Sequence, residues 1–143
     1  MRTSFLVCGL VVCLIGVGCG ADDGRIKVYP AQGKVLVKGQ PALGARVVFY
    51  PTTSDVDGKK LPTPAGDTDA SGKYVLTSYK PEDGAPAGDY KVTVVWLEPP
   101  PANAQGIFDQ KDRLQGRYSD PQTSPLKATV PEGGGEILPF ELQ

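Results

Sequence analysis

The side chains available for chemistry are carboxylates, lysines, arginines, tyrosines and three cysteines, because the 143-residue chain contains no histidine. A Ser-His-Asp or Cys-His nucleophile cannot be assembled from this chain alone. Zinc, copper and non-haem iron sites with imidazole ligands are excluded for the same reason. An enzyme with this sequence would have to work through carboxylates, Lys, Tyr or Arg.

One stretch has the spacing of the first half of a calcium-binding loop. Asp67, Asp69 and Ser71 place oxygen atoms at alternate positions, and Gly72 stands at the sixth position. The twelfth position is Ser78, whereas a calcium loop closes with a bidentate Glu. The alternative is a turn before a strand, held by backbone hydrogen bonds to an Asp side chain. We predict the turn, with no metal ligand in the chain.

Two further groups of residues could bind or act on a ligand. Trp96 precedes the proline run Glu98–Pro101, which favours an extended conformation. Together they could mark an exposed surface that binds a partner. Trp96 also alternates in phase with Val92 and Val94, and this phase predicts that it packs in the core. A small acid–base or anion-binding cluster could form farther on, although charged loop residues are more often solvated; its members are Asp109, Asp112, Arg113, Arg117 and Tyr118.

The N-terminal residues are typical of a secretory signal. Met1–Ser4 carries one positive charge, the apolar run Phe5–Val17 follows, and small residues flank Cys19. The run is shorter than the roughly 20 apolar residues that a transmembrane helix needs. The segment resembles a bacterial lipoprotein signal, which implies cleavage before Cys19 and attachment of acyl chains such as palmitate to it. A simple signal peptide or an anchor helix is the alternative.

The resemblance to a lipoprotein signal divides the chain into a signal peptide at 1–18, a tether at 19–27 and a domain at 28–143. Cys8 and Cys13 would leave with the signal, so the mature chain would have no free thiol and no disulfide. Two acyl chains would hold the protein stably at a membrane. The expected location is therefore a bacterial cell envelope, lipid-anchored and facing the periplasm or the exterior.

The rest of the chain predicts one all-β domain. Its 18 Gly and 14 Pro interrupt short runs of β-branched and aromatic residues. The expected strands are Gln32–Val37, Ala45–Tyr50, Tyr74–Thr77, Tyr90–Trp96, Pro125–Val130 and Ile137–Leu142. Only Ile107–Leu114 has a spacing that could form one or two helical turns. The formal net charge of −1 provides no basic surface for nucleic acid. The pattern predicts an antiparallel sandwich.

Four sequence blocks stand in the order of a known family. They are Gly33–Val35, Gly39–Val47, Thr68–Tyr74 and Pro86–Val94. In this order they resemble the carboxypeptidase regulatory-like domain, and the tail from Arg113 to Leu142 resembles small bacterial lipoproteins built on it. The resemblance implies a transthyretin/prealbumin-like Greek-key sandwich of about seven strands. It also implies an adhesion or accessory role, because the resembled domain is the non-catalytic part of the carboxypeptidases.

The sequence thus predicts a lipid-anchored, non-enzymatic module that binds or scaffolds, with lipidation at Cys19 and no catalytic residue, cofactor or metal site. Its partner would be an envelope protein or a polysaccharide, recognised through loops or a sheet edge. The alternatives are a carboxylate-based envelope hydrolase using Asp109 or Asp112, and a purely structural secreted module.

Overall fold

Short β-strands make up the regular structure of the computed structural model, which describes residues 24–100, 102 and 110–143. There is no helix among these residues. The strands are β1 (Ala31–Val37), β2 (Gln40–Pro41), β3 (Arg46–Pro51), β4 (Asp55–Val56), β5 (Lys59–Lys60), β6 (Ala65–Asp67), β7 (Lys73–Val75), β8 (Gly88–Val95), β9 (Lys127–Val130), β10 (Gly135–Glu136) and β11 (Phe140–Leu142). The predicted all-β class is confirmed.

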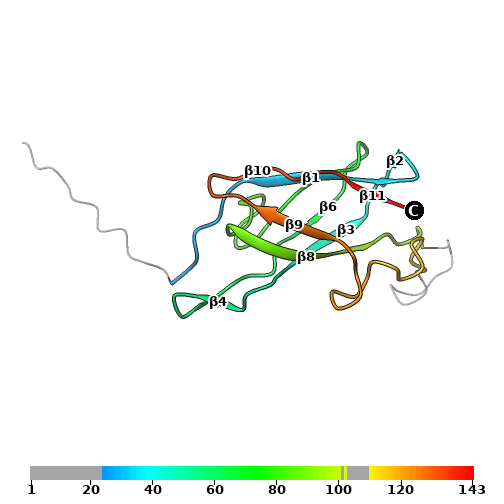
Figure 1. Cartoon of the computed structure of the whole chain (residues 1–143). Coiled ribbons are helices and arrows are strands. Elements are labelled where there is room, and N and C mark those ends of the chain that lie inside the picture. The colour runs from blue at the N-terminus through cyan, green and yellow to red at the C-terminus, as the bar shows by residue number, and fades with distance from the viewer. Residues whose placement is uncertain (1–23, 101, 103–109) are drawn as a thin grey trace, which may run out of the picture.

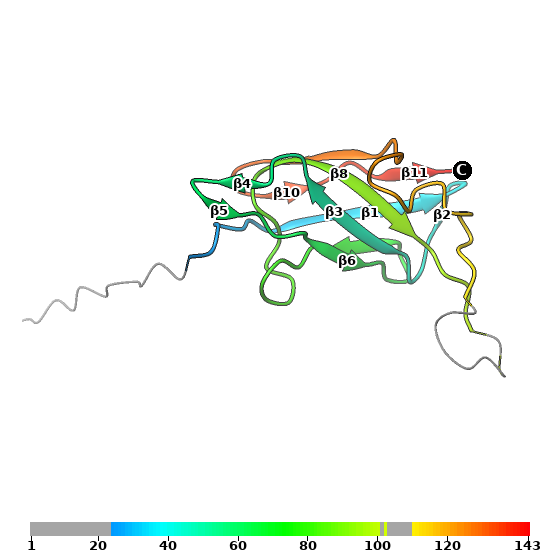
Figure 2. The ribbon, with the colours of Figure 1, turned by 90° about the horizontal axis from the view of Figure 1, so that it is seen from below.

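The strands form two facing layers and a small hairpin (Figure 1). One layer is the antiparallel sheet β6-β3-β8-β9. In the other layer β1 is the shared partner of β2, β7, β10 and β11. The β4–β5 hairpin projects from the end where the chain joins the domain, and the C-terminus lies at the opposite end (Figure 2). The two ends of the molecule are thus built from different parts of the sequence.

The expectation of an antiparallel sandwich of about seven strands is confirmed at the level of an all-β fold with antiparallel sheets, and the structure differs from it in detail. β10 and β11 both pair with β1 in parallel. The described residues form eleven strands, of which β2, β4, β5 and β10 are only two residues long. After β9 the chain crosses to the other layer, where β10 and β11 run alongside β1 in the same direction as β1. No local sequence pattern specifies this strand direction.

The core lies between the two layers and is rich in aromatic rings. Phe49 of β3 is at its centre, with ring centroids 5.5 Å from Tyr90, 6.1 Å from Tyr74 and 6.4 Å from Phe140. Along β8 the predicted alternation is confirmed, since Tyr90, Val92 and Val94 are all buried. The Tyr90 hydroxyl donates to the Pro86 carbonyl at 2.7 Å, which satisfies its polar atom inside the core.

The hydroxyl of Tyr74 is different, because it is buried without a hydrogen-bond partner. Burial raises the pKa of this phenol above its ordinary range, so the group stays neutral. We expect Tyr74→Phe to stabilise the fold by about 1 kcal/mol, because it removes an unsatisfied polar group from the core. Urea unfolding measures the change. Tyr90→Phe is the matched control and should destabilise, since Tyr90 loses a satisfied hydrogen bond; a destabilised Tyr74→Phe would contradict the assignment.

Candidate functional site

Residues 96–98, which follow β8, pair with residues 111–113, about fifteen positions farther along the chain. The Trp96 N–H donates to Asp112 Oδ1 at 3.0 Å, and the Arg113 N–H donates to the Trp96 carbonyl at 2.7 Å. The Glu98 N–H donates to the Lys111 carbonyl at 2.8 Å, so the two segments form a ribbon. This ribbon brings Trp96 next to two members of the predicted charged cluster. It also shows that residues 110–114 are not helical; the rest of the expected helical segment lies outside the described residues.

Trp96 is held at the edge of the core and is half-buried. Its indole Nε1–H donates to the Leu43 carbonyl at 2.8 Å, and the Arg113 guanidinium carbon lies 4.6 Å from the ring centroid. The predicted packing against the core is therefore correct, although the ring is not fully enclosed. Leu43 is 61% exposed and Leu97 is 37% exposed. We call Leu43, Trp96, Leu97 and Arg113 the Trp96 surface.

Asp112 holds this surface in place and is not arranged for acid–base chemistry. Besides the Trp96 N–H, its carboxylate accepts the Leu114 N–H at 3.0 Å and the Gly116 N–H at 2.9 Å. Backbone groups therefore surround both carboxylate oxygens. Asp109, the second acidic residue of the predicted cluster, lies outside the described residues.

The other two members of the cluster support the C-terminus. Arg117 Nη1 donates to the Gln143 carbonyl at 3.2 Å, and the Tyr118 hydroxyl accepts the Gln143 N–H at 3.4 Å. The Tyr118 carbonyl accepts the Val94 N–H at 2.9 Å. Arg117 and Tyr118 thus contact the C-terminal residue, whereas Asp112 and Arg113 contact Trp96, so the four described members of the cluster divide between two places.

The stretch that resembled a calcium loop is a turn, as predicted. Asp69 Oδ1 accepts the Ser71 N–H at 2.8 Å, the Ser71 hydroxyl at 2.7 Å and the Lys73 N–H at 3.0 Å. The hydrogen bonds from the Ser71 side chain and from the backbone lower the pKa of Asp69. Asp67 is turned toward Arg46 in an exposed ion pair of 2.8 Å. Among the described residues, no group of three Cys, Asp or Glu side chains is placed to hold a metal ion.

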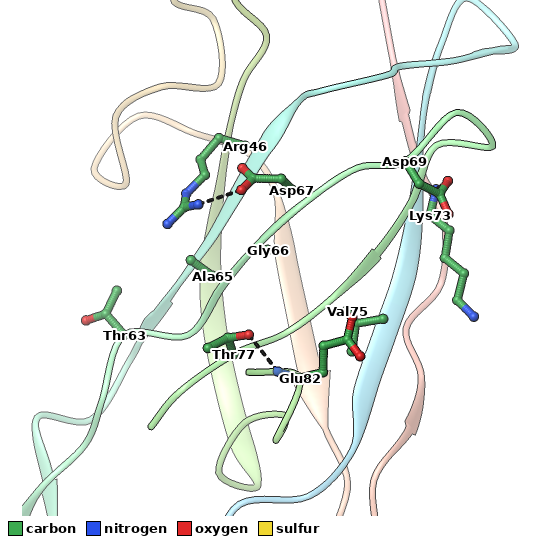
Figure 3. Close-up of a pocket in the computed structure, with 10 residues that line it drawn as sticks. All are labelled: Arg46, Thr63, Ala65, Gly66, Asp67, Asp69, Lys73, Val75, Thr77 and Glu82. Atoms are coloured by element: carbon green, nitrogen blue, oxygen red, sulfur yellow. Dashed lines mark hydrogen bonds and ion pairs between the residues drawn. The ribbon is translucent and has the colours of Figure 1, made fainter. Parts of the chain in front are cut away.

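A shallow polar groove of about 590 Å³ lies where β6 meets β7 (Figure 3). Its floor is formed where the two backbones approach closely, since a Cβ on Gly66 would lie 2.4 Å from the Val75 carbonyl oxygen. Cationic and anionic side chains alternate around it: Arg46, Asp67, Asp69, Lys73 and Glu82. This mixture has no dominant charge and no aromatic platform, so the groove does not indicate a particular ligand.

Sequence reasoning missed the part that Leu43 plays at the Trp96 surface. Leu43 lies between Pro41 and Gly44, in a segment whose glycines predict only a turn. The Leu43 contribution is a backbone carbonyl, which any residue type supplies. No sequence signal could therefore have found it.

No protein family profile, curated protein or solved structure matches the chain. Within the part of the chain that the structure describes, no helix has the length and apolar character needed to cross a membrane.

Proposed function

We propose that the protein is a lipid-anchored, non-enzymatic binding module of a bacterial cell envelope, attached through Cys19. The observation that carries this proposal is the separation of the two ends of the sandwich. The chain joins the domain beside the β4–β5 hairpin, whereas the ribbon formed by residues 96–98 and 111–113 lies at the other end, near the C-terminus (Figures 1 and 2). A domain tethered by its N-terminal segment thus leaves the Trp96 surface accessible to a partner.

The Trp96 surface has the composition of a recognition site. Aromatic residues and arginine are enriched at the centres of protein interfaces, where they combine apolar area with directed polar contacts. Here an arginine stacks on the only tryptophan of the chain, and two exposed leucines belong to the same segments: Leu43, whose carbonyl accepts the indole N–H, and Leu97, the next residue along. An envelope protein or a polysaccharide is the proposed partner. The finer fold assignment, a carboxypeptidase regulatory-like Greek-key sandwich, is part of the same proposal.

The anchor is tested by intact-mass analysis of the protein from its native membrane fraction, beside a Cys19→Ser variant. A mature chain that begins at Cys19 with added acyl chains, together with loss of those chains in the variant, is the expected result. An unmodified chain in the membrane fraction, or one cut at another position, would overturn the lipoprotein assignment.

The binding role is tested by capture from envelope extracts with immobilised protein. Trp96→Ala should lose the captured partner, because it removes the ring and its hydrogen bond to Leu43. Val56→Ala is the matched control, since Val56 is also an exposed apolar residue but lies on the β4–β5 hairpin at the other end. Equal capture by both variants would exclude the Trp96 surface as the binding site.

A further inference from the structure

The two long sides of the sandwich are not equivalent, because one is closed by backbone hydrogen bonds and the other is open. On the closed side, Ala65 of β6 and Thr77 exchange backbone hydrogen bonds of 3.1 and 2.8 Å. On the open side, an apolar groove of about 600 Å³ separates β9 from the segment that leads into β11. Leu138 borders this groove and is 85% exposed, whereas Ile137 and Phe140 are buried. The exposed Leu138 and the apolar lining of the groove together mark this side of the sandwich as an interaction surface.

The backbone of β9 has hydrogen-bonding groups directed away from the sheet. β9 is the last strand of its layer and pairs only with β8 among the described strands. The Val92 N–H of β8 donates to the Leu126 carbonyl, so residues 126, 128 and 130 direct their backbone groups toward β8. Lys127 and Thr129 therefore direct their N–H and C=O groups outward. These groups can accept one more strand.

The flanking prolines restrict how such a strand can align. Pro125 and Pro131 have no N–H to donate. An antiparallel copy of β9 centred on Lys127 or on Thr129 would place one of these prolines at a hydrogen-bonding position. A copy centred on Ala128 instead matches Lys127 with Thr129 of the other chain, twice by symmetry, and satisfies the outward N–H and C=O groups of these two residues, while Pro125 and Pro131 face each other at the two ends of the pairing.

We propose that β9 pairs antiparallel with β9 of a second copy of this chain, about a two-fold axis at Ala128. The proposal goes beyond the binding role proposed above and does not depend on the anchor. It joins the two four-stranded sheets into one continuous sheet and covers the exposed Leu138 of each copy. The two Trp96 surfaces lie at opposite ends of the pair, each at the end where the N-terminal segment of the other copy joins its domain.

Charge complementarity favours this occupant. In the single chain Lys91 and Lys127 stand directly opposite each other, and like charges in that position are destabilising. No ion pair joins either lysine to a carboxylate in the described part of the chain. Asp89 lies beside Thr129, whose hydroxyl donates to the Asp89 carboxylate at 2.5 Å. In the pair, Lys127 of one copy comes opposite Thr129 of the other and within reach of Asp89 beyond it.

Disulfide trapping tests the alignment in the full chain, purified in detergent and oxidised mildly. Residues at the two-fold axis form a non-hydrogen-bonded pair with Cα atoms about 4.5 Å apart, which suits a disulfide. Ala128→Cys should therefore give a cross-linked dimer. Lys127→Cys is the matched control and should not, because its opposite residue is Thr129. The unmodified chain controls for Cys8, Cys13 and Cys19. Absence of the Ala128→Cys dimer, or an equal yield from Lys127→Cys, would overturn the proposal.

Sedimentation velocity over a range of concentrations tests the pairing without a cross-link. Thr129→Pro removes an outward N–H and the exposed hydroxyl bond to Asp89 but leaves the backbone hydrogen bonds to β8 intact, so it should fold and remain monomeric. Leu138→Ser should weaken the dimer about tenfold through loss of buried apolar area, whereas Leu43→Ser, at the Trp96 surface, should not. Circular dichroism checks that each variant is folded. Cys19→Ser should dimerise normally, so a failed anchor leaves this result unchanged. A wild-type chain that stays monomeric throughout would overturn the proposal.

Discussion

Replacing Gly84 with Ala is expected to destabilise the fold by about 3–5 kcal/mol. Gly84 has a φ of +94°, and a Cβ at this position would lie 1.8 Å from the Tyr29 carbonyl oxygen. Neither backbone can move aside easily. The Gly84 N–H donates to the Leu76 carbonyl at 2.9 Å, and Ala85 and Tyr29 exchange backbone hydrogen bonds of 3.0 and 2.9 Å. The substitution therefore has to break the contact that joins the N-terminal segment to the domain.

Gly58→Ala is the control for the Gly84 prediction. Gly58 also has a positive φ, +73°, but no atom lies within 4 Å of the Cβ that Ala would add. Its substitution isolates the conformational penalty, which is about 1 kcal/mol. Chemical denaturation of both variants measures the difference. Similar losses in the two variants would show that the Tyr29 contact relaxes at little cost, contrary to the expectation.

The strands that could be predicted are those whose alternation faces the core. β1, β3, β8 and β9 were each expected within about two residues of their observed bounds, because their apolar residues repeat with a period of two. The expected strand at Tyr74–Thr77 is shifted, since β7 is Lys73–Val75. Of the segment expected from Ile137, only Phe140–Leu142 forms a strand, and Ile137 N–H is bonded to the Gln32 carbonyl.

The remaining strands have no such pattern. β6 contains Ala65, Gly66 and Asp67, whose low β-propensity predicts a loop. The strand exists because Gly66 allows the Val75 backbone to approach closely, a property of the folded neighbourhood that local sequence does not specify. Likewise, β10 is a two-residue pairing fixed by the β1 strand beside it. β4 and β5 differ, because the Asp57–Gly58 turn between them has positive φ at both residues and is a local signal for a hairpin.

In the candidate site, too, some features could be predicted from the sequence and others depend on the folded structure. Sequence alone singled out Trp96, Asp112 and Arg113, and the structure brings these three together. It could not show that the Asp112 carboxylate is occupied by backbone groups, since that depends on how residues 110–116 turn. Of the cluster that suggested acid–base chemistry, Asp112 and Arg113 contact Trp96 and help to hold the Trp96 surface.

Asp112→Ala is expected to destabilise the domain by about 2–3 kcal/mol and to loosen the Trp96 surface. The substitution leaves the N–H groups of Trp96, Leu114 and Gly116 without their shared acceptor. Because Trp96 is the only tryptophan in the chain, its fluorescence reports on this site alone. We expect an emission shift to longer wavelength and easier quenching by acrylamide, as the ring becomes more exposed to water.

Two further variants show whether the Asp112 effect arises from hydrogen bonding at this site. Asp112→Asn keeps one acceptor oxygen and should lose about half as much stability. Asp120→Ala removes a carboxylate from the same loop whose Oδ1 accepts only the Gln122 N–H in the described contacts, at 2.8 Å. It should leave the Trp96 fluorescence unchanged. If Asp112→Ala gave the fluorescence and stability of Asp120→Ala, the ribbon formed by residues 96–98 and 111–113 would be held by its backbone pairing alone, and Asp112 would not be what positions the Trp96 surface.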